Sequence, residues 1–356
     1  MPTLETHGAR AAGRRYYQES LKGKGRFVFL LVVLLGAAAC VGLVLGAADI
    51  KIRDLFALAM GETQGPRDVA RAHILLAIRL PRLVLALIAG TGLAISGTVM
   101  QAVLRNPLAS SYTLGVSSGA GFGAALAIGL GMGVWGGKYI VVANAFLFGM
   151  ASMALVYGIA RIRGAGPGML ILAGIAVNYF FSALIAVVKY MVQHDALAGI
   201  VFWLMGGLNL ANWKNIAVLL PLVVVPALWL ILKSPWDLNA MSSGDEVAVG
   251  LGVDPERTRI IVLTLAALIT SSVVAFTGVI GFVCLVGPHM ARMTIGSDHR
   301  FLLPFSCLTG ALLLLLSDAA ARTVIQPTEL PVGIVTALLG VPFFLHLLIR
   351  SRRYWS

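Results

Sequence analysis

Long stretches without a charged residue recur along the whole of this 356-residue chain. Hydrophobic residues make up 59% of the sequence and charged residues 12%, whereas soluble domains carry about 25% charged residues. With so few charges, the bilayer must be the main solvent of the chain. The uncharged stretches occupy residues 27–48, 83–104, 106–137, 139–160, 164–188, 196–213, 215–232, 260–288, 301–317 and 330–349.

These stretches predict an all-α integral membrane protein, because a helix of about 20 apolar residues spans a bilayer. The first run is longer than the core of a signal peptide, which has about 7–15 residues, and therefore predicts an uncleaved helix. Stretch 196–213 holds Asn209, Asn212 and two glycines, so we expect a loop with a short re-entrant or surface helix. The ten predicted transmembrane helices cover residues 27–47, 83–104, 112–131, 139–160, 168–191, 214–232, 258–277, 281–295, 302–321 and 331–349.

The distribution of Lys and Arg predicts the orientation. Ten helices place both termini on one side, and with that side cytoplasmic, 17 cations lie inside and ten outside. This bias favours an N-in, C-in topology. Six of the outside cations lie in the predicted external loop 49–82, although the positive-inside rule predicts few cations there. Either a long loop tolerates them, or they form a docking surface for an acidic partner.

Composition and motifs argue against several other classes of protein. The net charge of +12 does not indicate nucleic-acid binding, because Lys and Arg lie between the apolar runs. Cys40, Cys284 and Cys307 lie inside apolar runs, and no two histidines are four residues apart, so we expect no metal site. HExxH is absent, and the sequence shows no nucleophile–base or metal constellation, so we expect no catalytic residue and no enzyme activity.

The sequence holds no motif for hydrolysing ATP. The phosphate loop GxxxxGK[ST] is absent, so if ATP drives this protein, ATP and magnesium would be bound by a separate ATPase, and we expect no cofactor in this chain. Asp318, Lys189, Arg322 and His346 lie near predicted helix ends, which leaves the span centres almost free of ionisable groups. An ion-coupled secondary transporter usually keeps such groups at mid-membrane, so that alternative is disfavoured.

A weak internal repeat relates two parts of the sequence. SGTVMQAVLRNP (96–107) and TGVIGFVCLVGP (277–288) each place a proline ten residues after a glycine. Halves of five helices, about 27–191 and 214–349, would be inverted relative to each other because five is odd. Such inverted repeats are typical of transporters.

Residues 241–259, MSSGDEVAVGLGVDPERTR, are unusually acidic for this chain. They hold four of its 15 carboxylates: Asp245, Glu246, Asp254 and Glu256. Alternating apolar residues and glycines predict one or two short cytoplasmic helices and a tight turn. The segment fits either insertion into a partner's groove or a solvated loop with a helix cap, and its spacing leaves both interpretations open.

The chain resembles a known family, the FecCD-like permease subunits of type II ABC importers for iron chelates, haem and cobalamin. The resemblance covers about residues 27–350. The motifs that carry it are RLPR (79–82), GTGLAISGTVMQAVLRNPLASSYTLGVSSGAG (90–121), GDEVAVGLGV (244–253), GFVCLVGPHMAR (281–292), SDHR (297–300) and ELPVGIVTALLGVPFF (329–344).

The resemblance implies a homodimer around one path, two ATP-binding cassette ATPase subunits on the cytoplasmic side and a periplasmic substrate-binding protein on the other side. Arg79, Arg82 and Arg322 match external arginines that pair with glutamates of the binding protein. The predicted cytoplasmic loop 234–257 contains the match to the family's coupling helices, which seat on the ATPase. The coupling residues are Gly244, Asp245, Glu246, Val247, Ala248, Gly250, Leu251 and Gly252.

Two further motif matches concern the path itself. The cytoplasmic gate corresponds to Gly166, Pro167, Gly168 and Met169, but these positions lack the Ser and Thr that the family often carries there. That departure puts the chemistry of the gate in doubt. Asn106-Pro107 and Pro288-His289 match paired positions that we interpret as helix-breaking turns, with His289 structural rather than a ligand.

We therefore expect a basic cytoplasmic segment (1–26), followed by one permease domain (27–350) in the bacterial inner membrane. Its cargo would be an iron chelate such as a siderophore or haem, with cobalamin as the alternative. Met169, Met191 and Met205 are candidates for residues near the path. A secondary transporter and a structural membrane protein remain as alternatives from other classes.

Overall fold

A computed structural model describes residues 3–45, 66–133, 137, 139–162 and 164–350. Every regular element in these residues is a helix, which confirms the all-helical prediction. The helices are α1 (Thr3–Val44), α3 (Pro66–His73), the π-helix η1 (Ile74–Arg79), α4 (Leu80–Val103), α5 (Val116–Leu130), α6 (Ile140–Arg161), α7 (Pro167–Met191), α8 (His194–Leu204), α9 (Trp213–Lys233), α10 (Pro235–Ser242), α11 (Asp245–Gly250), α12 (Pro255–Thr277), α13 (Val283–Ile295), α14 (His299–Ala321) and α15 (Val332–Arg350).

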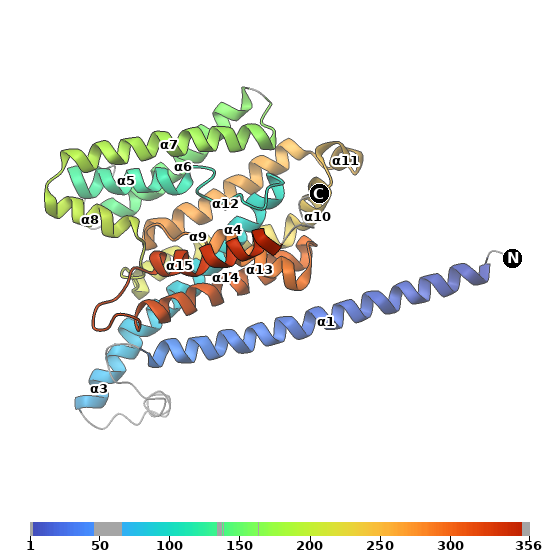
Figure 1. The fold of residues 1–356 in the computed structure, drawn as a ribbon, viewed down its shortest axis with the longest axis horizontal. Helices are drawn as coiled ribbons and strands as arrows, with labels where there is room; N and C mark the ends of the chain where they lie inside the picture. Colours follow the sequence, from blue (N-terminus) through green and yellow to red (C-terminus); the bar gives the residue numbers. More distant parts are fainter. Residues whose placement is uncertain (1–2, 46–65, 134–136, 138, 163, 351–356) are drawn as a thin grey trace.

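The long helices run roughly along one axis of the molecule (Figure 1). Helices α5 to α8 lie on one side and α13 to α15 on the other, with α4, α9 and α12 between them. α5 packs on α6 and α6 on α7, and in the second half α13 packs on α14 and α14 on α15 in the same order. α4 and α12 also contact each other, and α1 lies against α14.

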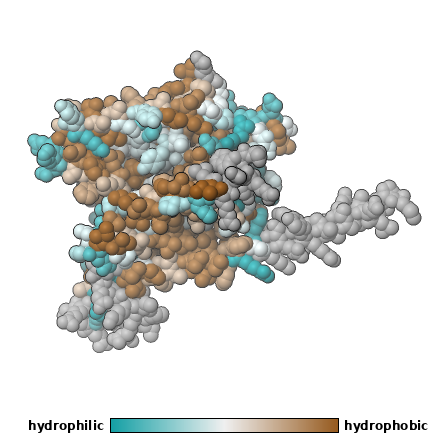
Figure 2. Space-filling model, viewed as in Figure 1, coloured by the Kyte–Doolittle hydropathy of each residue, from teal (hydrophilic) through white to brown (hydrophobic). Residues whose placement is uncertain are grey.

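Each of the ten predicted segments coincides with a helix. Among the described residues, seven helices are long and apolar enough to cross a membrane, while α5 and α15 are shorter apolar helices. Apolar side chains cover much of the visible surface between the helix ends, and hydrophilic patches gather toward the ends (Figure 2). The count of ten spans and the N-in, C-in orientation stay predictions. Stretch 196–213 forms α8 followed by a loop, as predicted.

Two predicted boundaries are wrong. The first helix begins at Thr3 rather than at residue 27. The predicted external loop 49–82 is helical from Pro66 onward and continues into α4; Lys51 and Arg53 of that loop lie outside the described residues. The π-helical turn η1 lies just before Pro81, whose ring nitrogen cannot donate a hydrogen bond to the preceding turn.

Pro288 and His289 do not form a turn, because both lie inside α13. Pro288 has no N–H to donate to the carbonyl of Cys284, one turn earlier. The side-chain amide of Gln101 on α4 donates to that carbonyl instead, at 3.4 Å. The helix thus continues through the proline because a neighbouring helix pairs the released carbonyl.

The close approach of α4 to the Cys284 carbonyl of α13 depends on Gly97 of α4. A Cβ atom at Gly97 would overlap the carbonyl oxygen of Cys284. Gly97 is inside α4, whereas Gly278 of the second repeat copy follows the end of α12, so the two copies are not structurally equivalent. The repeated spacing therefore does not support the inverted halves, although the order of helix packing agrees with them.

We predict that Gly97→Ala destabilises the protein by about 1–3 kcal/mol, because the added methyl group forces α4 away from the backbone of α13. The measurement is the melting temperature of the detergent-purified protein, followed by the loss of its monodisperse peak on size-exclusion chromatography. Gly158→Ala on α6 is the control, since nothing lies within 4 Å of its added Cβ. Equal melting temperatures for the two variants would contradict the prediction.

Candidate functional site

Helix α4 connects the two ends of the molecule at which the sequence predicted sites. Arg82 lies in its first turn, and Arg105 lies two residues beyond its last residue. With 24 residues, the helix is about 36 Å long, enough to cross a bilayer core. The predicted docking arginines and the predicted coupling segment therefore lie at opposite ends of one buried helix.

The three predicted docking arginines lie together, but two of them are buried. Arg79 donates to the carbonyl oxygens of Leu43 and Val44 at 2.5 and 2.6 Å. Arg322 donates to those of Gly42 and Leu45 at 2.9 and 2.8 Å. The last carbonyls of a helix have no partner within the helix and carry partial negative charge. Arg79 and Arg322 thus hold the C-terminal end of α1.

A buried carboxylate organises this arginine cluster. The side chain of Asp318 on α14 is 2% exposed and pairs with Arg82 at 2.8 Å and with Arg322 at 3.0 Å. Arg82 also pairs with Glu329 at 2.7 Å, and the Glu329 side chain is 46% exposed. Arg82 therefore has a partner, Glu329, that reaches the surface.

The predicted coupling segment contains the expected short helices, α10 and α11. Val247, Val249 and Leu251 are 48%, 62% and 68% exposed, while Ala248 is buried beneath them. Asp254 caps α12 by accepting hydrogen bonds from the next two backbone N–H groups along the helix. The cap agrees with the second interpretation of the sequence, and insertion of the exposed apolar residues into a partner's groove stays a prediction.

A second polar cluster fixes α10 to the start of α14. The side-chain amide of Asn239 donates to Asp298 at 2.9 Å, and its oxygen accepts the backbone N–H of His299 at 3.0 Å. Hydrogen bonds from Arg300 hold the pKa of Asp298 well below its usual range, so this carboxylate stays charged. The SDHR motif therefore anchors the loop that carries the coupling segment.

The predicted gate residues, Gly166 to Met169, form the N-terminal start of α7. Gly166 is extended and Pro167 is the first residue of the helix, where a proline's missing N–H costs nothing. The preceding residue, Ala165, is buried, and its carbonyl accepts a hydrogen bond from Arg259 of α12 at 3.5 Å. The same guanidinium pairs with Asp245, the first residue of α11, at 2.8 Å.

The Asn106-Pro107 turn is present as predicted. The side-chain oxygen of Asn106 accepts the backbone N–H of Leu108 at 2.9 Å, an arrangement that closes a tight turn. The turn follows α4 and leads into an irregular segment before α5. His289, which we interpreted as structural, is half-buried on α13.

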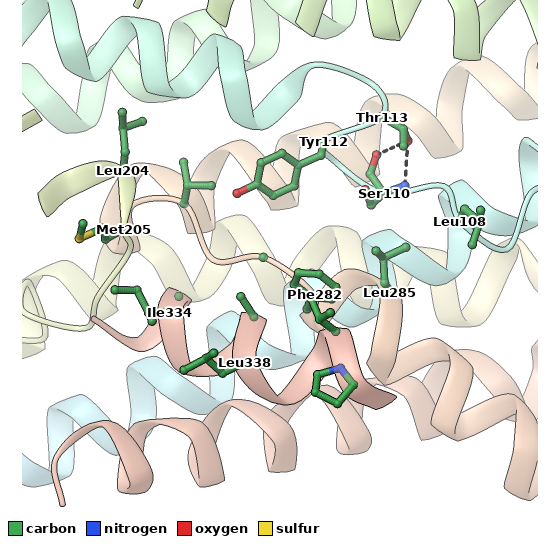
Figure 3. A pocket seen from close by; sticks show the side chains of 16 residues that line it. Leu108, Ser110, Tyr112, Thr113, Leu204, Met205, Phe282, Leu285, Ile334 and Leu338 are labelled. Atoms are coloured by element: carbon green, nitrogen blue, oxygen red, sulfur yellow. Dashed lines mark hydrogen bonds between the residues drawn. The ribbon is translucent and has the colours of Figure 1, made fainter. Parts of the chain in front are cut away.

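A cavity of about 800 Å³ opens beside this turn (Figure 3). It is lined by the segment after α4, the end of α8, the start of α13 and one side of α15. Its described lining residues carry no charge, and Tyr112, Ser110 and Thr113 are the polar ones among them. Met205 lines the cavity, whereas Met169 and Met191 are not among the lining residues.

The sequence analysis gave three residues at these sites no role there. Asp318 had a signal, because it lies four residues before Arg322 on one helix. Arg259 had a weaker signal, as a charge followed by 18 uncharged residues in α12. Glu329 had none, since its pairing with Arg82 links residues far apart in sequence.

Comparisons with known proteins agree with this arrangement. The family model of the FecCD transport family matches residues 31–350. The chain is 39% identical to a hemin transport system permease protein of Yersinia pestis, covering 93% of this chain and 96% of the relative. It is 42% identical to a cobalamin import system permease protein of Halobacterium salinarum, covering 76% of this chain and 72% of the relative.

A solved structure shares the fold. It is described as an inward-facing conformation of a putative metal-chelate type ABC transporter, and it superposes with a TM-score of 0.81 at 33% identity. The match covers 92% of this chain and 99% of the other. The chain therefore belongs to the FecCD transport family and is an integral membrane permease of the ABC importers.

Proposed function

We propose that this permease works as a homodimer in the bacterial inner membrane and carries an iron chelate, a siderophore complex or haem, into the cytoplasm. Two ATPase subunits would bind ATP and magnesium, and a periplasmic binding protein would deliver the cargo. The observation that carries the proposal is the uncharged cavity of about 800 Å³ between the arginine cluster and the coupling segment.

The cavity supports a bulky cargo with a large apolar surface. Its volume lies within the range of about 300–1,000 Å³ typical of ligand pockets. Tyr112, Phe282 and Met205 offer broad, adaptable contacts to a flat or irregular chelate. We expect the cavity to bind its cargo weakly, because a conduit must release what it admits.

Support for the iron-chelate cargo comes also from the hemin relative and from the metal-chelate transporter structure. The cobalamin relative keeps a corrinoid cargo as the second candidate. A secondary transporter gains no support, because the buried carboxylate of Asp318 lies at the end of α14 between two arginines.

The cargo prediction is tested with the full complex in proteoliposomes that contain ATP, using haem, a ferric hydroxamate and cobalamin as separate probes. The binding protein that co-purifies with the tagged permease is supplied with each probe. We expect ATP-dependent uptake of haem or the ferric hydroxamate. Uptake of cobalamin alone would establish the alternative cargo, and uptake without ATPase subunits would contradict the ABC mechanism.

We predict that Leu251→Glu abolishes co-purification of the ATPase subunit. Leu251 is 68% exposed at the tip of the coupling segment, and a carboxylate there cannot enter an apolar groove. Leu210→Glu is the matched control, because Leu210 is exposed in the loop before α9, at the opposite end of the molecule. The prediction fails if both variants retain the ATPase equally.

We predict that Arg82→Gln weakens binding of the periplasmic protein at least about tenfold, since truncating one partner of a hydrogen-bonded charge pair mainly speeds dissociation. Asp318 keeps its second partner, Arg322, so the fold should survive. The measurement is surface plasmon resonance on permease in nanodiscs. Lys214→Gln, which removes an exposed cation in the first turn of α9, should leave the affinity unchanged; equal affinities for both variants would exclude Arg82 from docking.

A further inference from the structure

One buried side chain connects the predicted coupling segment to the predicted gate. Arg259 lies in the second turn of α12, and its side chain is 4% exposed. One end nitrogen of its guanidinium contacts Asp245 Oδ2 at 2.8 Å, and the other donates to the carbonyl oxygen of Ala165 at 3.5 Å. Asp245 opens α11, and Ala165 immediately precedes the gate residues 166–169.

The two contacts differ in strength. The contact with Asp245 is a short, charge-assisted bond, which is roughly twice as strong as a bond between neutral groups. The contact with Ala165 is long and involves a neutral carbonyl. When the two segments move apart, the guanidinium should therefore follow the carboxylate and release the carbonyl.

Asp245 lies at the surface, where it would move together with α11. Its side chain is 37% exposed, and it forms a second, longer ion pair of 3.7 Å with Arg105 at the end of α4. Arg259 itself is enclosed, and the carboxylate of Asp245 compensates its charge. A buried cation depends strongly on such a partner.

The turn held by Arg259 is strained. Ala165 has φ +48°, in the left-handed region where a residue with a Cβ atom is disfavoured by roughly 1–2 kcal/mol. Its N–H donates to Ala160 at the end of α6, and its carbonyl is held by Arg259. Strained turns persist when their surroundings hold them in place. The position of the first residues of α7 therefore depends on the guanidinium.

We infer that Arg259 is a positioning residue that transmits movement of the ATPase-seating segment to the cytoplasmic gate, through Asp245 on one side and the Ala165 carbonyl on the other. The inference rests on the proposed function, since it requires an ATPase on α11. Displacement of α11 draws the guanidinium from Ala165, the strained turn relaxes, and the start of α7 shifts. This is a hinge driven from a distant site.

The experiment follows gate exposure in the complete complex. A cysteine replaces Gly168, which is exposed and has open space around its Cβ position, in a background where exposed Cys40 is serine. The rate of labelling by a water-soluble maleimide is measured with and without ATP plus vanadate. In this background we expect the labelling rate to depend on nucleotide.

Arg259→Lys keeps the charge but loses the planar fork that spans both partners. We expect this variant to keep its bound ATPase and its rate of ATP hydrolysis, and to lose the nucleotide-dependent change in labelling. Arg257→Lys is the matched control, because Arg257 is exposed two residues earlier on the same helix. Asp245→Asn removes the charge at the other end of the contact. Because Asp245 is half-exposed, this variant should fold and can replace Arg259→Lys in the experiment if Arg259→Lys does not fold.

The outcomes separate the two proposals. If the starting protein binds no ATPase or shows no response to nucleotide, the proposed function fails. If it responds, and Arg259→Lys and Asp245→Asn respond equally well, the inference is overturned while the proposed function stands. Loss of ATPase binding in both variants would also overturn it, because the residues would then act at the docking contact.

Discussion

Lipid cannot form hydrogen bonds with the polypeptide backbone, and this constraint shapes the whole molecule. Every N–H and C=O inside a bilayer must find its partner within the protein, so the chain is built from helices. Where a helix ends or is interrupted, a polar side chain from another helix supplies the missing partner. Arg79 and Arg322 do this at the end of α1, and Gln101 does it beside Pro288.

Polar side chains that pair with groups at helix ends also place charges at the two ends of the bundle. Asp318 balances two arginines at one end, and Asp245 balances Arg259 and Arg105 at the other. Both sets include residues at or next to the ends of α4, and the cavity lies beside the turn that follows this helix. The polar groups that stabilise the helix ends are thus also the groups nearest to the surfaces proposed for binding-protein and ATPase contacts.

The mechanism proposed for the permease needs few moving parts. The core around α4 is closely packed, and Gly97 brings the backbones of α4 and α13 together without an intervening side chain. The predicted gate, by contrast, follows a strained turn whose carbonyl, that of Ala165, accepts a hydrogen bond from the guanidinium of Arg259. Movement is expected at this turn, where few contacts hold the conformation, because a dense core resists small displacements.

The sequence by itself determined the class of the protein, since periodic loss of charge predicts membrane helices, and ordered motifs identified the family. It located all ten long segments and the Asn106-Pro107 turn, because these depend on local composition and local hydrogen bonds. It placed Pro288 in a turn and residues 66–82 in a loop, because local rules cannot show a partner on another helix. Only the tertiary structure decided that Arg79 and Arg322 are buried against α1 and that Arg259 joins Asp245 to Ala165. Those contacts link residues far apart in the chain, and only packing brings them within hydrogen-bonding distance.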